Sequence, residues 1–258
     1  MEDYGFVSDN ALRIRERIEG AAARAGRAAG SVSFMAVTKF HPLAAVEAAY
    51  DAGLRLFGEN RVQEAEAKYA DIAQRFPGAR VELIGSLQSN KARKACALFS
   101  AVESVDSLSL LGELEKRARA QGKVLDVLFE LHTGEESKAG FPDRDSLFEA
   151  CDLLCSLSEE RGAAGAAVVA GAAGAAGAAG GLSLRGLMTM APFTKEEAPV
   201  RASFRSLKAA FEELRSRYRF PSFDVLSMGM TNDYEIAIEE GSTLVRIGTA
   251  LFGARSPA

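Results

Sequence analysis

A lysine stands directly after a short apolar run near the start of the chain. Residues Val32–Thr38 combine β-branched, aromatic and other apolar side chains, which is typical of a buried parallel strand, and Lys39 follows at once. Partial burial at a strand end favours the uncharged amine, the form that attacks an aldehyde carbon. Lys39 is therefore a candidate for Schiff-base chemistry. The alternative is a surface lysine whose stem covers apolar groups while its charge stays in water.

Two glycine-containing turns near the C-terminus are candidates for binding a phosphate. The segment LSMGMTNDYEIAI joins an apolar strand to a helix that we expect to begin near Thr231, and RIGTALFG, residues Arg246–Gly253, has the same form. N–H groups at the start of a helix bind anions. A phosphate near the amine of Lys39 would suit a phosphorylated aldehyde as ligand. Ordinary turns and helix caps, which need the same glycines, are the alternative.

Two further polar clusters follow predicted strands. They are FGENRVQE, residues Phe57–Glu64, and ELIGSLQSNK, residues Glu82–Lys91. Asn60 in the first cluster could line a site or only cap the next helix. His41 and His132 are the only histidines, and neither has a second histidine at the spacing of metal ligands, so we expect no metal site.

The elements that position these residues alternate along the chain. Eight apolar segments are separated by helical patterns, after a leading helix over Leu12–Ala28. Alternation of this kind predicts a parallel sheet, and eight units predict a closed (β/α)8 TIM barrel, whose chemistry gathers at the carboxyl ends of the strands. An open doubly wound sheet is the alternative. The predicted strands are Val32–Thr38, Arg55–Gly58, Val81–Gly85, Ala101–Val105, Val124–Leu131, Leu184–Met190, Phe223–Ser227 and Thr243–Ile247.

The length of 258 residues suits a single barrel domain over residues 1–258, since such barrels have ~250 residues. One low-complexity tract, the Ala/Gly insertion at residues 161–181, interrupts the pattern between a helix over Asp145–Glu160 and the sixth strand. It contains no proline, which excludes a collagen-like repeat. We expect a flexible connection at the barrel end opposite the site, and a functional element is the alternative.

Composition excludes several classes of protein. The net charge of -4 lacks the concentrated basic field that nucleic acids require. The acidic N-terminus does not have the pattern of a signal peptide, and no apolar run is long enough to span a membrane. Cys96, Cys151 and Cys155 show neither disulfide nor zinc spacing. We therefore expect a cytoplasmic protein, acting as a monomer, with no nucleic-acid or membrane partner.

The motifs resemble those of the pyridoxal phosphate homeostasis protein family, the YggS/PROSC type. The matching segments run in family order from about residue 33 to 253 and cover nearly the whole chain. They are AVTKFHP, FGENRVQE, LIGSLQSNK, VESVDS, GEESKAGF, GLMTMAPF and LSMGMTNDYEIAIEEGSTLVRIGTALFG. The resemblance implies a barrel similar to the N-terminal domain of alanine racemase, which is fold type III of the proteins that bind pyridoxal 5'-phosphate (PLP).

The resemblance also implies a set of cofactor-binding residues. Lys39 would carry PLP as a Schiff base, Arg246 would face the pyridine nitrogen, and Asn60 would lie beside the ring. Two departures from the family pattern are His132 and Thr133, where an Asn-rich loop is usual, and Thr231, which keeps the hydroxyl of the usual Ser. The implied phosphate contacts are Ser227, Gly248 and Thr249, with help from the turn at Met228 and Gly229.

The function implied by the resemblance is that of a cofactor carrier without robust catalytic turnover. It would buffer PLP or deliver it to apo forms of PLP-dependent enzymes, in vitamin B6 and amino-acid or keto-acid homeostasis. A PLP-dependent racemase or decarboxylase of the same fold is one alternative, although a racemase needs a second base from an additional β domain, and the sequence ends at Ala258 just past the barrel. A phosphosugar enzyme without PLP is another.

Overall fold

The structure is a computed structural model that describes residues 4–134, 139–164 and 180–253. Eight parallel strands form one closed barrel in chain order, with β8 hydrogen-bonded to β1, so the predicted TIM barrel is confirmed and the open sheet is excluded. The strands are β1 Ser33–Val37, β2 Leu56–Glu59, β3 Arg80–Leu83, β4 Ala101–Val105, β5 Val124–Glu130, β6 Gly181–Met188, β7 Val225–Met230 and β8 Leu244–Ile247.

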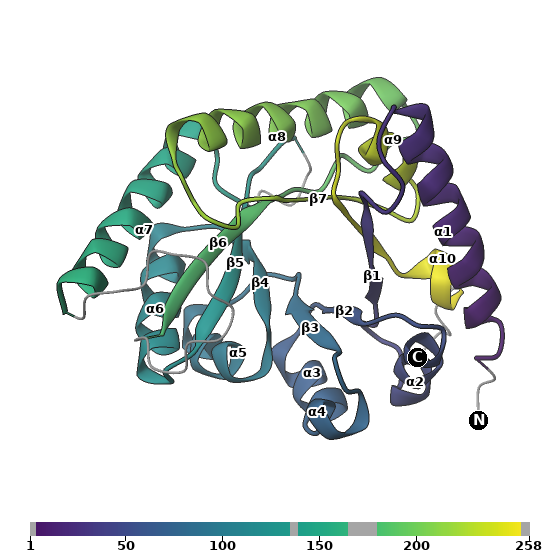
Figure 1. Cartoon of the computed structure of the whole chain (residues 1–258), viewed down its shortest axis with the longest axis horizontal. Coiled ribbons are helices and arrows are strands. Elements are labelled where there is room, and N and C mark those ends of the chain that lie inside the picture. Colours follow the sequence, from purple (N-terminus) through teal and green to yellow (C-terminus); the bar gives the residue numbers. More distant parts are fainter. Residues whose placement is uncertain (1–3, 135–138, 165–179, 254–258) are drawn as a thin grey trace.

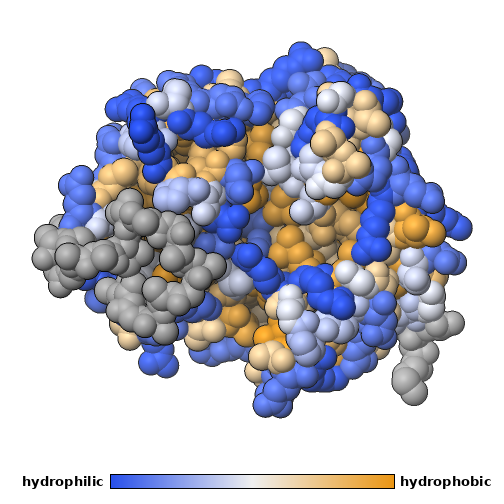
Figure 2. Space-filling view, in the orientation of Figure 1, coloured by the Kyte–Doolittle hydropathy of each residue, from blue (hydrophilic) through white to orange (hydrophobic). Residues whose placement is uncertain are grey.

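Helices surround the barrel and bury their apolar faces against it (Figure 1). In the view of Figure 2, hydrophobic side chains gather in the middle of this face and hydrophilic side chains surround them. The helices are α1 Val7–Arg24, α2 Leu43–Asp51, α3 Val62–Tyr69, α4 Ile72–Arg75, the 3-10 helix η1 Ser89–Lys91, α5 Ala92–Leu98, α6 Leu108–Ala120, α7 Arg144–Ala164, α8 Glu197–Arg217, α9 Tyr234–Glu239 and α10 Thr249–Phe252.

The leading helix α1 completes this outer layer. The last two strands are followed only by short helices, α9 with 6 residues and α10 with 4, which leave part of the barrel uncovered. Helix α1 lies along both of them in Figure 1 and buries a stripe of apolar residues that includes Ile14 and Ile18. Arg17 binds Glu235 of α9 at 2.5 Å, and Asn10 donates to the carbonyl of Leu251 in α10 at 3.1 Å. Helix α1 therefore braces the strand ends where a phosphate was expected.

The structure corrects the prediction for the seventh unit. Strand β7 continues to Met230, so Met228 and Gly229 lie in the strand and not in a turn after it. The helix begins at Tyr234, later than the predicted start near Thr231. The carboxylate of Asp233 accepts the N–H of Met230 at 2.6 Å, and this local bond holds a turn where a helix would otherwise start.

The helix and the strand that flank the Ala/Gly tract have other ends than predicted. Helix α7 continues to Ala164 because alanine is the best helix former, and strand β6 begins at Gly181, whose N–H donates to the carbonyl of Lys123 at 2.9 Å. Residues 165–179 of the tract lie outside the described residues.

Candidate functional site

The predicted site residues occupy neighbouring strands at one end of the barrel. Lys39 follows β1, and Gly248 follows β8, which pairs with β1 through Ala36 and Ile247. A side chain added at Gly248 would lie 3.4 Å from the carbonyl oxygen of Val37, so the two strand ends are in direct contact. The lysine and the turn after β8 are therefore brought together, as the sequence predicted.

The loop that carries Lys39 also packs against α10. The ring of His41 lies 4.8 Å from the ring of Phe252, centroid to centroid. Phe40, between Lys39 and His41, has a φ of 66°, which a residue other than glycine rarely adopts. This conformation turns the chain sharply after β1, and the side chain of Lys39 is half-buried.

A second lysine, which sequence reasoning missed, holds this loop. Lys68 Nζ donates to the carbonyl oxygens of Thr38 at 2.7 Å and His41 at 3.1 Å, on either side of Lys39. Glu64, which accepts from Lys68 at 2.9 Å, also accepts the N–H of Phe40 at 2.5 Å. These contacts fix the backbone on both sides of Lys39.

The charge of Lys68 is balanced inside the protein. Lys68 lies 2.6 Å from a carboxylate oxygen of Glu59, and the Glu59 side chain is fully buried. Burial raises the pKa of Glu59, while the cation of Lys68 and the hydroxyl of Thr38, which donates at 2.6 Å, oppose that rise. Burial also raises the pKa of Tyr69, whose hydroxyl contacts the Thr38 hydroxyl at 2.7 Å. The 29-residue separation of Lys39 and Lys68 leaves no local sequence pattern that would reveal this contact.

Arg246 lies in the barrel interior and is only 4% exposed. Its Nη2 donates to the carbonyl of Thr189 at 2.8 Å, and its Nη1 donates to the hydroxyl of Ser227 at 2.6 Å. Ser227 in turn donates to a carboxylate oxygen of Glu103 at 2.6 Å, and that oxygen lies 3.8 Å from Arg246 Nη1. The guanidinium is thus fixed by strands β4, β6 and β7.

The hydroxyl of Ser227 is therefore used within the barrel. Its proton goes to Glu103 and a lone pair accepts from Arg246, and the residue is fully buried. The predicted contact between Ser227 and a phosphate stays a prediction. The structure connects Ser227 to the guanidinium instead.

The ends of β7 and β8 are linked by a hydroxyl. The Thr231 hydroxyl accepts the N–H of Ala250 at 3.3 Å, which ties the turn after β7 to the start of α10. Gly229 has a φ of 95°, and an added side chain would lie 2.5 Å from the Cβ of Ala237. Glycine is thus required where β7 passes close to α9.

The turn after β8 presents N–H groups that can bind an anion. In the part of the chain that the structure describes, the N–H of Gly248 donates to no other group. Thr249 opens α10, and the first N–H groups of a helix have no acceptor within it. Donors in this state fit a phosphate.

Asn60 stands at the end of β2, beside the next strand end. A side chain at Gly85 would lie 2.5 Å from the Asn60 carbonyl oxygen, so the loops after β2 and β3 touch. Asn60 is half-buried at this edge, where the sequence placed it.

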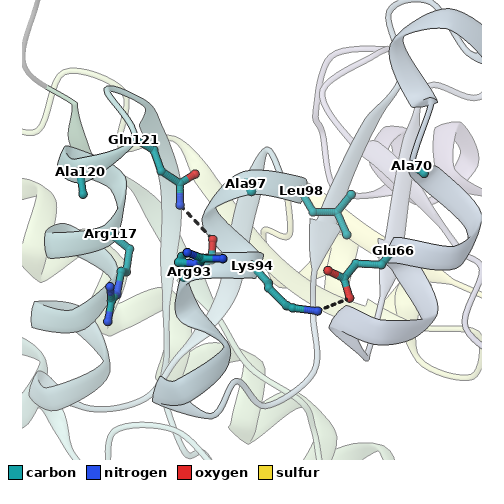
Figure 3. Close-up of a pocket in the computed structure, with 9 residues that line it drawn as sticks. All are labelled: Glu66, Ala70, Arg93, Lys94, Ala97, Leu98, Arg117, Ala120 and Gln121. Carbon is teal, nitrogen blue, oxygen red and sulfur yellow. Dashed lines mark hydrogen bonds and ion pairs between the residues drawn. The ribbon is translucent and has the colours of Figure 1, made fainter.

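A cavity of about 770 Å³ lies elsewhere, among the outer helices α3, α5 and α6 (Figure 3). Among the residues that line it, Lys94 binds Glu66 at 3.0 Å, Arg117 binds Glu113 at 2.6 Å, and Gln121 donates to the backbone carbonyl of Arg93 at 2.9 Å. This cavity contains none of the predicted site residues.

The described residues contain neither a cluster of metal ligands nor a membrane-spanning helix. No group of three or more His, Cys, Asp or Glu side chains could hold a metal ion among residues 4–134, 139–164 and 180–253. Over these same ranges, no helix has the length and apolar character needed to cross a membrane.

Comparison with known proteins identifies relatives over nearly the whole chain. The family model of the alanine racemase N-terminal domain matches residues 10–168 and 160–256. The pyridoxal phosphate homeostasis protein of Vibrio alginolyticus is 34% identical over 252 residues, which are 96% of this chain and 97% of the relative. The PLP-bound structure of PipY from Synechococcus elongatus PCC7942 has a TM-score of 0.72 and 35% identity, over 93% of this chain and 100% of PipY.

Alanine racemase from Streptomyces coelicolor A3(2) shows the shared fold at greater distance. Its TM-score is 0.67 at 20% identity, over 94% of this chain and 58% of the racemase.

Proposed function

The chain belongs to the pyridoxal phosphate homeostasis protein family, and on this premise we propose that it binds PLP as a Schiff base on Lys39 and buffers or delivers the cofactor. One observation carries the proposal. The strand end that bears Lys39 is in contact with the turn that bears the unsatisfied N–H of Gly248. An amine and an anion site side by side are what a phosphorylated aldehyde requires.

The surrounding residues fit the cofactor. The N–H groups at Gly248 and Thr249 suit its phosphate, and the buried guanidinium of Arg246 supplies a donor for its pyridine nitrogen. Glycine at position 229 lets the backbone of β7 pack closely against α9. The turn after β7 is held to α10 by the hydroxyl of Thr231. Asn60, at the end of β2, lies at the edge where the ring would sit.

The roles of the residues follow from these positions. When bound, PLP supplies an aldehyde for condensation and a ring that withdraws electrons. Lys39 would hold PLP through its amine, which would condense with the aldehyde to a Schiff base with loss of one water and without oxidant or reductant. Lys68 binds the carbonyls of Thr38 and His41 and so fixes the backbone on both sides of Lys39.

The comparisons favour a carrier over a racemase. The Vibrio alginolyticus relative, which is 34% identical over 96% of this chain, is named a homeostasis protein and not a racemase, whereas the alanine racemase at 20% identity shares the fold alone. The proposal includes a cytoplasmic monomer whose partners are apo forms of PLP-dependent enzymes.

The visible spectrum of the purified protein titrated with PLP tests the proposal. Wild type should show the absorbance of a lysine-bound cofactor, and borohydride reduction followed by peptide mapping should place the modification on Lys39. Lys39→Ala should lose this absorbance while weak binding through the phosphate turn survives. Lys91→Ala, after β3, is the matched control and should behave as wild type. A modification mapped to Lys91 or Lys138 in the wild type would refute the assignment.

A further inference from the structure

Two buried glutamates inside the barrel have no place in the function described so far. Glu82 on β3 is 6% exposed and Glu103 on β4 is fully buried. The two strands pair with Glu82 opposite Ala101, two residues before Glu103, so both side chains enter the barrel from neighbouring strands. Burial raises the pKa of the Glu82 carboxyl, and the neighbouring Glu103 carboxyl raises it further.

One oxygen of Glu103 accepts from Ser227, and its other oxygen, Oε1, is buried and accepts no hydrogen bond in the part of the chain that the structure describes. Two carboxyl groups in an apolar interior do not both ionise readily, because each charge disfavours the other and neither is hydrated. The raised pKa of Glu82 favours its protonated form, which can donate the hydrogen bond that Glu103 Oε1 lacks.

Three charged groups face the pair. Arg80 on β3 lies 3.2 Å from a Glu82 oxygen and is shared with Asp126 on β5, which it binds at 3.0 Å. Arg246 on β8 lies 3.8 Å from Glu103. Arg80 is already paired with Asp126. Glu103 is therefore the acidic side chain of the pair that faces Arg246.

We propose that Glu103 is a positioning residue for the cofactor site, which holds the guanidinium of Arg246 in place through the Ser227 hydroxyl while Glu82 supplies the hydrogen bond that fixes Glu103. The inference rests on the proposed binding of PLP beside Arg246. A buried guanidinium without a counter-charge is destabilised unless it moves to contact water or another acceptor. Loss of the Glu103 charge should therefore move Arg246 away from the ring nitrogen.

The test compares Glu103→Gln with Glu82→Gln. Glutamine at 103 removes the charge, so PLP affinity should fall on the order of tenfold, as for loss of a charge-assisted hydrogen bond, and the absorbance maximum of the lysine-bound cofactor should shift. Glutamine at 82 keeps a permanent N–H donor to Glu103, so affinity and absorbance at neutral pH should match wild type. Glu115→Gln is the control, because Glu115 is buried outside the barrel and Gln still accepts from Leu182.

The pH dependence of stability shows whether the Glu82 carboxyl acts through its proton or only by filling space in the barrel. Burial and the neighbouring carboxylate raise the pKa of Glu82. A raised pKa in the folded state means that stability is highest below the unfolded pKa of about 4.3 and falls as pH rises toward the folded pKa. Glu82→Gln should remove this fall, and Glu115→Gln should keep it.

The outcomes are distinct. If Glu103→Gln leaves affinity and absorbance unchanged, or Glu82→Gln impairs both as strongly, the inference is overturned. If Glu103→Gln does not fold, Ser227→Ala breaks the same link without a change of charge, and an unchanged absorbance maximum in that variant would overturn it. If the wild type binds no PLP on lysine, it is the proposed function that fails.

Discussion

Replacing Lys68 by methionine should destabilise the protein strongly, and the size of the effect follows from its surroundings. Methionine keeps the unbranched apolar stem but removes the cation that lies 2.6 Å from the fully buried Glu59. Breaking a buried ion pair by removing one partner costs about 3 to 5 kcal/mol. Glu59 can reduce the cost by taking up a proton. From an unfolded pKa of about 4.3, protonation at pH 7 costs about 3.7 kcal/mol at 1.36 kcal/mol per unit, which limits the expected loss to about 3 to 4 kcal/mol.

This reasoning fixes the pH dependence of the loss. Without Lys68, the pKa of Glu59 in the folded state should rise further above its unfolded value, because Lys68 is what opposes the effect of burial. A group with a raised folded pKa stabilises the fold below its unfolded pKa and loses that stability as pH rises. The loss in free energy of unfolding of Lys68→Met relative to wild type should therefore be small near pH 4.5 and grow toward pH 7.

Urea unfolding followed by circular dichroism at several pH values measures the effect. The double variant Lys68→Met with Glu59→Gln should regain much of the stability at pH 7, because no buried charge is left unpaired. Lys94→Met is the matched control, since its pair with Glu66 is exposed and should contribute less than about 1 kcal/mol. A deficit that does not change with pH, or a double variant no more stable than Lys68→Met, would refute the buried-charge explanation.

Three further results are expected. Thr249→Val removes one donor at the turn after β8 and should weaken PLP binding by roughly tenfold, as measured by equilibrium titration; an unchanged dissociation constant would place the phosphate elsewhere. Shortening the Ala/Gly tract within residues 162–180 should leave PLP binding intact, because the free-energy cost of closing a connection changes slowly with its length; a folded variant in which PLP no longer modifies Lys39 would contradict this. With a panel of L- and D-amino acids, the protein should show negligible racemase, transaminase or decarboxylase turnover, and sustained turnover abolished by Lys39→Ala would establish an enzyme instead.

The sequence predicted the architecture because the barrel depends on local patterns. Each strand is a short apolar run beside a helical pattern, and β4 was predicted with the same ends that the structure shows, Ala101–Val105. Lys39 could be located for the same reason, since a lysine at the end of such a run stands at the mouth of a barrel. The errors arose where a single side chain decides the backbone, as Asp233 does after β7.

The interior contacts of the site could not be predicted because they join residues far apart in the chain. Ser227 and Glu103 are separated by 124 residues, and only closure of the barrel brings them together. One signal was present, since a charged residue within an apolar strand is costly to bury unless it has a partner. Glu82 and Glu103 both carry that signal, but which residues they contact depends on the register of the closed sheet.

The contacts of Arg246 inside the barrel bear on whether the protein is a carrier or an enzyme. A guanidinium stays cationic. The guanidinium of Arg246 is held in place by Ser227, the Thr189 carbonyl and Glu103. Placed beside the pyridine nitrogen, a fixed cation disfavours the protonated ring and so weakens the electron withdrawal on which carbanion chemistry depends. Alanine racemase has the same barrel fold, so the barrel itself does not exclude catalysis. On our proposal that Arg246 faces the pyridine nitrogen, the interior charges of this barrel would hold that cation in place, which would support retention of the cofactor without supporting its reactivity.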